Sequence, residues 1–262
     1  MSSGTAIGSS HIRANRECED YGGSVACLTC AGESALLFVA DGAGSASNAK
    51  FGSKFVCDSF VAHFAVPMAS QTYKPISEVE ARLWVRHVRD SLLAQAEIMN
   101  CRLEDFATTF LGCILTSEAS LLIQIGDGAI VLSEMDSPGE FNVYEWPDQG
   151  EYANSTTFVT SDDALEKLKV VNYGLPLKHV ALFTDGLQRL LLDYNEKLPH
   201  QPFFNYWFQR LHDQRHDIDS LSQELNDLLT SEIVNKKTDD DKALVLASNI
   251  ASLESETCVR NC

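Results

Sequence analysis

The chain has 262 residues, of which 45% are hydrophobic, and its 37 acidic against 20 basic residues give a formal net charge of −17 at pH 7. That charge opposes binding to nucleic acid or to anionic membrane surfaces, and no basic patch offsets it. The sequence has no apolar run near the roughly 20 residues that a membrane-spanning helix needs, and its first residues lack a signal-peptide pattern. We therefore expect a soluble cytoplasmic protein with neither a membrane nor a nucleic-acid partner.

The sequence shows no internal repeat, low-complexity block or interdomain linker. Its length therefore predicts a single domain over residues 1–248, followed by a C-terminal tail over residues 249–262. The eight cysteines are scattered through apolar segments, which indicates reduced thiols rather than a disulfide framework. Cys27 and Cys30 form a CxxC pair, but the context that zinc or redox chemistry requires is missing.

The first predicted elements are a hairpin and a helix. The apolar runs 24–30 and 34–40 are separated by residues 31–33, as in two hairpin strands, and the second run ends at Asp41-Gly42. After the small residues 43–47, an apolar helical spacing follows that includes three aromatic residues expected in the core, namely Phe51, Phe55 and Phe60.

A long helix comes next. Ser77 with Glu80 forms a capping-box signature, and the helix that follows also contains Trp84 and His87. The apolar stripe expected on it consists of Val79, Leu83, Val88, Leu92 and Ala96. Three strand-like runs then cover residues 107–116, 120–125 and 129–133, and their short connections predict an antiparallel meander.

The remaining pattern alternates a loop, strands and helices. Residues 134–156 are predicted to be an irregular loop before a strand near Phe158. A buried strand over residues 180–184 ends at Asp185-Gly186, and helices are expected over residues 202–211 and 218–233. The last buried strand is predicted over residues 243–247, directly after the acidic run 239–241.

Aspartates stand at the ends of three of the strands that we expect to be buried. An aspartate at the rim of a core strand is held rigidly and still faces solvent, which suits a metal ligand. A glycine directly after it lets the backbone carbonyl approach the same ion. A single Asp-Gly pair is usually only a turn, so the prediction depends on the order of Asp41, Asp185 and the acidic run 239–241 together.

Six short motifs occur in order between about residue 8 and residue 248. They are Gly8-Ser9-Ser10-His11-Ile12-Arg13 with Cys18-Glu19-Asp20, Phe38-Val39-Ala40-Asp41-Gly42-Ala43-Gly44-Ser45, Thr108-Thr109-Phe110-Leu111, Ile125-Gly126-Asp127-Gly128, Thr184-Asp185-Gly186-Leu187 and Asp240-Asp241-Lys242-Ala243. This series resembles the PP2C family of metal-dependent serine/threonine protein phosphatases, in particular its bacterial branch. The resemblance implies an α+β fold, an α/β/β/α sandwich of two antiparallel sheets flanked by helices.

The resemblance also implies a pair of divalent cations, Mg²⁺ or Mn²⁺, and the residues that hold them. Asp41 would bridge the two ions, and Gly42 would offer its carbonyl to one of them. The second ion would be served, directly or through water, by Glu19 or Asp20, Asp185 and Asp240. Asp127 matches the residue that holds a weaker third ion in some members. Asp239 and Asp241 remain alternatives to Asp240 as the residue that matches the family's ligand position. The simpler interpretation of the other acidic residues in that run is that they are solvated loop charges.

The chain departs from the family pattern at two positions. The arginine that grips substrate phosphate in many relatives falls at Asn15, although Arg13 and Arg16 flank it and a guanidinium there would suit a phosphate. Arg13 can be interpreted equally well as a surface charge without a role in phosphate binding. The histidine proposed as a general acid in eukaryotic relatives is replaced by Ala43. His11 is a candidate for that role, although hydrogen bonding within a first strand is the favoured interpretation.

The leading hypothesis is hydrolysis of phosphoserine or phosphothreonine in proteins, opposing a serine/threonine kinase, with Asp41, Asp185 and Asp240 as the catalytic carboxylates. Two cations would lower the pKa of a water molecule and neutralise charge on the phosphoryl oxygens. Two alternatives stay open: a catalytically degenerate PP2C fold that senses or scaffolds, and a phosphoesterase acting on small molecules.

Overall fold

The computed structural model describes the chain except for residues 30–31, 69–76, 148–155, 214–216 and 250–262. Two five-stranded antiparallel sheets form its centre, with the strand orders β2-β3-β4-β5-β8 and β1-β12-β9-β6-β7. The first sheet comprises β2 Tyr21–Thr29, β3 Gly32–Ala40, β4 Phe110–Leu115, β5 Ser120–Ile125 and β8 Lys169–Tyr173. The second comprises β1 Ser2–Ala6, β12 Lys242–Ser248, β9 Leu177–Phe183, β6 Ala129–Glu134 and β7 Asn142–Val143.

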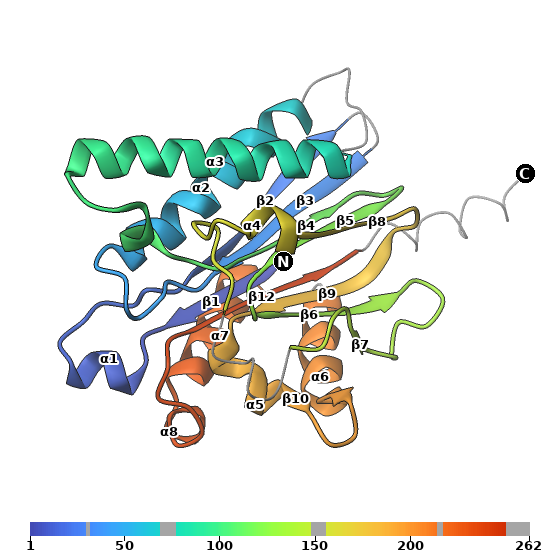
Figure 1. Cartoon of the computed structure of the whole chain (residues 1–262). Helices are drawn as coiled ribbons and strands as arrows, with labels where there is room; N and C mark the ends of the chain where they lie inside the picture. Colours follow the sequence, from blue (N-terminus) through green and yellow to red (C-terminus); the bar gives the residue numbers. More distant parts are fainter. Residues whose placement is uncertain (30–31, 69–76, 148–155, 214–216, 250–262) are drawn as a thin grey trace, which may run out of the picture.

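Helices cover the outer face of each sheet, so the layers follow the order helix, sheet, sheet, helix (Figure 1). The long helices on the first sheet are α2 Ala49–Met68 and α3 Glu78–Met99. The helices on the second sheet include α5 Gln188–Leu191, α6 Gln201–His212, α7 Ile218–Thr230 and α8 Glu232–Asn235. The shorter elements are α1 Ser9–Arg13, α4 Ala164–Lys167, the 3₁₀ turns Leu103–Phe106 and Asp185–Leu187, and the two-residue strands β10 Leu192–Asp193 and β11 Leu198–Pro199. The expected fold class is confirmed.

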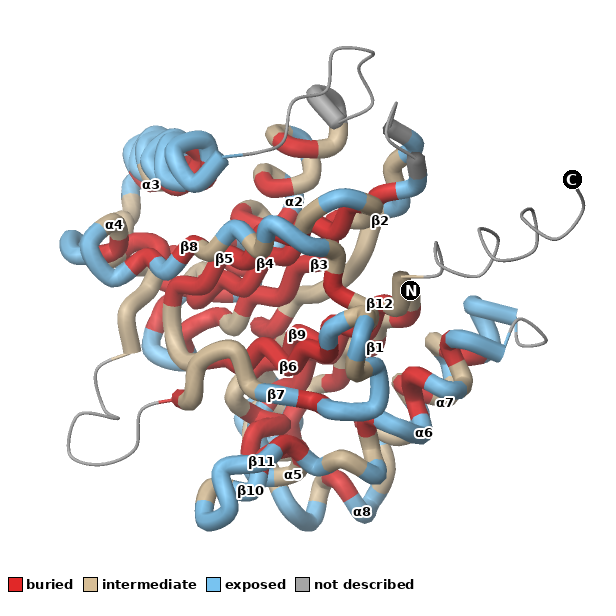
Figure 2. The backbone as a smooth tube through the Cα atoms, turned by 90° about the vertical axis from the view of Figure 1, so that its right-hand side faces the viewer, coloured by how far each residue is buried: buried red, intermediate tan, exposed pale blue. Residues whose placement is uncertain are grey.

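Three layers of apolar side chains explain this arrangement. Leu37 and Val39 lie between the two sheets, and a cluster that includes Trp84 fills the space between the first sheet and its helices. A third cluster, which includes Phe183 and Phe204, fills the space between the second sheet and its helices. Because the central strands are covered on both faces, their sequences are continuously apolar rather than alternating. Figure 2 shows this as buried backbone running through both sheets, with exposed backbone on the outer helices.

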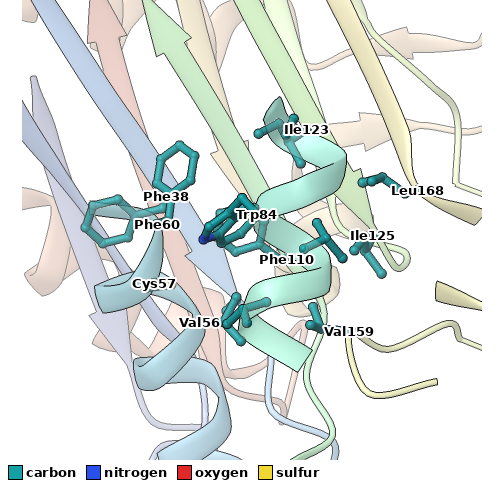
Figure 3. Packing of buried hydrophobic residues seen from close by; sticks show 14 of the residues in the cluster. Phe38, Val56, Cys57, Phe60, Trp84, Phe110, Ile123, Ile125, Val159 and Leu168 are labelled. Atoms are coloured by element: carbon teal, nitrogen blue, oxygen red, sulfur yellow. The ribbon is translucent and has the colours of Figure 1, made fainter. Parts of the chain in front are cut away.

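Helix α3 begins at the predicted capping box, in which Ser77 and Glu80 bond to each other's backbone N–H groups. Its buried face differs from the predicted stripe, because Val79 and Leu83 are 66% and 44% exposed. The buried face instead consists of Ala81, Trp84, Val85, Val88, Leu92 and Ala96. Figure 3 shows Trp84 beside Phe60 and Phe110, and burying each of these aromatic side chains contributes roughly 1.5–3 kcal/mol.

Several local predictions need correction. Phe60 and most of Phe55 are buried, but Phe51 is 40% exposed and lies against Phe106 at the end of the core. His11 lies in the short helix α1, not in a strand. Phe158 lies in no strand; it directly precedes a turn that is closed by a 3.0 Å hydrogen bond from the Ser161 N–H to its carbonyl.

The predicted meander is wrong for β6, and the difference matters for function. β4 and β5 pair in the first sheet, whereas β6 pairs with β9 in the second. The chain crosses between the sheets at residues 126–128. Gly126 has a φ of 101° there and lies against Thr109, so a larger residue would be strained and would collide. The crossover places Asp127 where the two sheets meet.

The predicted helix over residues 218–233 is divided at Ser231, which ends α7 and accepts a hydrogen bond from Val234 N–H at the start of α8. The expected tail lies outside the described residues from position 250 onward. Among the residues that the structure describes, no helix combines the length and the apolar character needed to cross a bilayer.

Candidate metal centre

A cavity of about 270 Å³ opens where the ends of strands from both sheets converge. Asp41 follows β3 of the first sheet, Asp185 follows β9 of the second, and Asp127 lies in the crossover between β5 and β6. The residues that line this cavity are His11, Asp20, Asp41, Gly42, Ala43, Gly44, Ser45, Thr109, Asp127, Thr156, Phe158, Asp185, Asp240 and Asp241. Aspartates that are 221 positions apart in the chain thus face one space because the two sheets stack with their strand ends together.

Three of these carboxylates form a connected chain. The side chain of Asp41 shares hydrogen bonds with Asp185 and with Asp20, and Asp20 also accepts a 2.6 Å hydrogen bond from the Thr184 hydroxyl. Burial first, and then the charges of Asp20 and Asp185, hold the pKa of Asp41 well above its usual range. Burial raises the pKa of Asp20 likewise and raises the pKa of Asp185 to about 6. Negative charge is therefore unfavourable here unless a cation joins the site.

The backbone around Asp41 is fixed by two threonines of the segment before β4. The Asp41 N–H donates to the Thr109 hydroxyl at 3.0 Å, and the Thr108 hydroxyl donates to the Asp41 carbonyl at 2.9 Å. Gly42 pairs with Thr108 in an isolated bridge and lines the cavity. The Asp41-Gly42 turn is thus held from both sides, which keeps the carboxylate at the cavity wall.

Asp240 and Asp241 have different surroundings. Asp241 is buried and accepts hydrogen bonds from Gly8 N–H and Glu19 N–H, both at 2.6 Å, and it lies 2.8 Å from Nδ1 of His11. Its oxygens are therefore engaged in tying the N-terminal segment to the start of β12. The Asp240 carboxylate lines the cavity and accepts a 2.9 Å hydrogen bond from the Asp241 N–H. Asp240 is the freer of the two for binding a ligand.

The N-terminal candidates separate into three groups. Asp20 lines the cavity, whereas Glu19 lies outside its wall and contacts Arg16 at 2.5 Å. Arg16 also donates to the Gly44 carbonyl at 2.7 Å, which places its guanidinium at the rim of the cavity. Arg13 is exposed and pairs with Asp239 at 3.0 Å. The turn that separates the two arginines includes Asn15, which has a φ of 54°.

His11 lines the cavity, but both of its ring nitrogens face carboxylates. Nδ1 contacts Asp241, and Nε2 lies 4.0 Å from Oε2 of Glu19. This arrangement ties helix α1 to residues on either side of it. These contacts favour a structural role for His11 over the role of the general acid whose usual position is occupied by Ala43.

Three positions in or beside the cavity were not among the predicted site residues. Thr184 bonds to Asp20, Thr156 donates to Oδ2 of Asp127 at 2.6 Å, and Phe158 forms an apolar part of the wall. Thr184 stands directly before the Asp185-Gly186 pair, so its place in that motif was a usable signal. Thr156 lies in the predicted irregular loop, and Phe158 was expected only as part of a strand, so no pattern indicated that either lines the cavity.

The side chains fit a hard divalent cation. Among the described residues that line the cavity none is Lys or Arg, and Oδ1 of Asp185 is buried without a hydrogen-bond partner. Mg²⁺ and Mn²⁺ prefer oxygen ligands, and Mg²⁺ often binds through one or two carboxylates while keeping several waters. In the described part of the chain, no three His, Cys, Asp or Glu side chains already surround one point as a metal cage. Pairs of carboxylates, the Gly42 carbonyl and water would therefore share the coordination.

Comparison with known proteins gives consistent results. Residues 7–230 match the family described as Protein phosphatase 2C. The chain is 36% identical over 245 residues to Serine/threonine-protein phosphatase 3 of Escherichia coli (strain K12), covering 93% of this chain and 95% of that protein.

Solved structures of bacterial phosphatases share the fold at lower identity. The Mycobacterium tuberculosis serine/threonine phosphatase PstP/Ppp superposes with a TM-score of 0.63 at 17% identity, covering 94% of this chain and 97% of that chain. A PstP catalytic domain in complex with two manganese ions gives a TM-score of 0.61 at 18% identity, covering 94% of this chain and 96% of that chain. The serine/threonine phosphatase Stp1 of Staphylococcus aureus gives a TM-score of 0.59 at 16% identity, covering 94% of this chain and 93% of that chain.

Proposed function

The chain belongs to the protein phosphatase 2C family, and from that premise we propose that its acidic cavity holds two divalent cations, Mg²⁺ or Mn²⁺, for the hydrolysis of phosphoserine and phosphothreonine in proteins. One observation supports this most directly: Asp41, Asp185 and Asp240, from three separate strand ends, line the same cavity. When bound, the cations lower the pKa of water and offset negative charge on the phosphoryl group.

We assign the ligands from their positions around the cavity. Asp41 stands between Asp20 and Asp185 in the hydrogen-bonded chain, which suits the residue that would bridge both ions. Asp185, with its partnerless Oδ1, and Asp240 would hold one ion, with Asp20 acting directly or through water. Gly42 would contribute its carbonyl to the other. Asp127 also lines the cavity and would hold a weaker third ion.

We assign binding of the substrate phosphate to Arg16. Its guanidinium lies beside Gly44, which is part of the cavity wall, whereas Arg13 faces away toward Asp239. A guanidinium fork matches the oxygens of a phosphate, so Arg16 would exchange its contact with Glu19 for one with the substrate. This assignment places the function of the family's arginine one residue later in the chain.

The substrates we propose are phosphorylated proteins modified by an opposing serine/threonine kinase. The relative from Escherichia coli has the name of a serine/threonine-protein phosphatase, and its similarity extends over almost the whole of both chains. The alternatives of a degenerate sensing module and of a small-molecule phosphoesterase gain no support from the site. A degenerate member would be expected to lose ligands, and the carboxylates at the strand ends are retained.

The test compares hydrolysis of phosphothreonine and phosphoserine peptides by the wild type and by Asp185→Asn, with Mn²⁺ or Mg²⁺ and with chelator. We expect about a 100-fold or larger loss of kcat/KM in Asp185→Asn, because an amide is a weaker ligand than a carboxylate. Asp90→Asn, a matched change on the exposed face of α3, serves as the control. Equal rates for the wild type and Asp185→Asn would refute the proposal, and a preference for nucleotide or sugar phosphates would favour the small-molecule alternative.

A further inference from the structure

Asp127 stands between Gly126 and Gly128 in the crossover that joins the two sheets. Glycine restricts the backbone less than any other residue, so a turn with a glycine on each side of the aspartate has little stiffness of its own. Asp127 lines the cavity, and the direction of its carboxylate depends on how the peptide planes beside it are oriented. Contacts from outside the turn must therefore hold it in place.

Two buried glutamine side chains supply those contacts. Nε2 of Gln124, near the end of β5, donates to the Gly128 carbonyl at 3.1 Å and to the Gly126 carbonyl at 3.4 Å. Nε2 of Gln188, the first residue of α5, donates to the carbonyl of Asp127 itself. The two glutamines are 4% and 9% exposed. All three carbonyls of the crossover thus accept a hydrogen bond from a glutamine amide.

Gln124 holds the turn at a cost to stability. Its Oε1 is buried and, within the part of the chain that the structure describes, has no hydrogen-bond partner. A buried acceptor without a partner destabilises the folded state, and an apolar side chain of similar length would avoid that penalty. Such a side chain could not donate to the turn. The two donated bonds therefore explain a glutamine at this position better than packing does.

Gln188 is oriented in turn by Tyr194, whose hydroxyl donates to its Oε1 at 2.7 Å. Because the oxygen of the amide faces the tyrosine, the NH₂ end is directed to the Asp127 carbonyl. The Tyr194 ring packs edge-on against Trp146, with ring centroids 5.7 Å apart. The Lys197 ammonium group lies 4.9 Å and 5.9 Å from these two centroids. A continuous series of contacts thus extends from the exposed turn between β10 and β11 to the backbone of Asp127.

We propose that Gln124 and Gln188 are positioning residues that keep the Asp127 carboxylate directed into the cavity, with Tyr194 fixing the Gln188 amide. The inference rests on the proposed function, in which Asp127 would hold the weaker third ion. Neither glutamine is among the described residues that line the cavity, so both act through the turn. A ligand that is already oriented binds a cation more tightly, because less conformational freedom is lost on binding.

The test counts the Mn²⁺ ions bound per chain as the Mn²⁺ concentration rises, using electron paramagnetic resonance to measure the unbound ion. For Gln124→Met and Gln188→Met we expect the dissociation constant of the weakest ion to rise about 3- to 10-fold, the size of a lost hydrogen bond. The two tighter ions should bind as in the wild type. Asp127→Asn should weaken the same third ion at least as much as either glutamine substitution does.

Tyr194→Phe removes only a hydroxyl and should raise the same dissociation constant about 2- to 4-fold. Tyr206→Phe is the matched control, because it removes a hydroxyl that accepts a hydrogen bond from Arg210 on the surface of α6. Its Mn²⁺ binding should stay within about twofold of wild type. If the methionine variants fail to fold, Tyr194→Phe decides the matter.

Unchanged Mn²⁺ binding would overturn the positioning role of the residue replaced, and equal weakening of all the ions would show a merely structural role. A wild type that binds two Mn²⁺ ions and no third, or an Asp127→Asn variant that binds all three unchanged, would overturn this inference and leave the proposed binuclear centre intact. A wild type that binds no Mn²⁺ would overturn the proposed function and this inference together.

Discussion

The hydroxyl of Thr156 donates a 2.6 Å hydrogen bond to Oδ2 of Asp127. This bond connects the segment after residue 155 to the crossover between the two sheets. The same segment is held further along by the N–H of Val159, which donates to the Thr108 carbonyl at 2.8 Å, and by the guanidinium of Arg89, which donates to the Val159 carbonyl at 2.9 Å. Phe158 is thereby fixed as a wall of the cavity.

This relationship predicts the effect of removing the hydroxyl. Thr156→Val keeps the shape of the side chain but leaves Asp127 without its donor, so we expect about a 3- to 10-fold loss of kcat/KM, the size of one hydrogen bond. Thr156→Ser keeps the donor and should retain most of the activity. Phosphopeptide kinetics over a range of Mn²⁺ concentrations would measure both variants. Identical kinetics for Thr156→Val and wild type would show that Asp127 needs no such positioning.

Asp240 and Asp241 should respond to alanine substitution in opposite ways. Asp241→Ala removes the acceptor of two buried N–H groups and His11, so we expect the free energy of unfolding to fall by about 3–5 kcal/mol. Asp240→Ala removes a proposed ligand from a repulsive cluster, so the cation-free protein should change by less than about 1 kcal/mol while Mn²⁺ affinity drops at least about 10-fold. Urea unfolding and calorimetry distinguish the two effects. A reversed pattern would assign the ligand to Asp241.

Arg16 and Arg13 provide a matched pair for testing phosphate binding. For Arg16→Ala we expect about a 10- to 100-fold loss of kcat/KM, mainly through a higher KM, because charge-assisted hydrogen bonds to the phosphate are lost. Arg13→Ala removes an exposed ion pair with Asp239 and should change kcat/KM less than about twofold. Steady-state kinetics on one phosphothreonine peptide would suffice. A larger effect at Arg13 would contradict the assignment.

His179, far from the metal centre on β9, predicts part of the acid sensitivity of the fold. It is 7% exposed and stacks on Phe208, and burial first, then the charges of Lys178 and His212, lowers its pKa to about 4. The unfolded chain takes up this proton near pH 6.5 and the folded chain only near pH 4. The contribution of neutral His179 to the free energy of unfolding is therefore complete above pH 6.5. It is lost as the pH falls, by about 2 kcal/mol between pH 7 and pH 5.

The measurement for this prediction is urea unfolding at pH 7 and pH 5 in the wild type and in His179→Gln, which can still bond to the Ser248 hydroxyl. Between pH 7 and pH 5, the free energy of unfolding should fall less in the glutamine variant than in the wild type. The comparison removes the contributions of other titrating groups that the two proteins share. An unchanged pH dependence would mean that His179 becomes protonated in the folded protein.

The strands that end at aspartates could be predicted because burial on both faces imposes a continuous apolar run, and a charged residue marks where the strand leaves the core. The capping box of α3 was equally accessible, since it is a contact between residues three positions apart. The face of α3 was harder: the stripe through Val79 and Leu83 has the same periodicity as the buried one through Trp84, and only the position of the sheet selects between them.

The meander failed for a related reason. The short turn at residues 126–128 would allow β6 either to pair with β5 or to cross to the other sheet. The local sequence does not distinguish these two arrangements. The choice between Asp240 and Asp241 was likewise open, because both stand at the start of one strand. The structure separates them, because the Asp241 carboxylate accepts hydrogen bonds from residues more than 200 positions away and the Asp240 carboxylate accepts one from its neighbour Asp241.

By itself, the sequence of this protein indicated most of its elements and the acidic residues available at strand ends, because local periodicity and burial govern those features, and its resemblance to the PP2C family implied the layered fold class. The tertiary structure alone decided which carboxylates share one cavity, and that Asp241 is already engaged while Oδ1 of Asp185 has no partner. The physical reason is that solvation, charge interaction and hydrogen bonding act through space. Residues distant in the chain acquire a joint chemistry only once the two sheets are stacked.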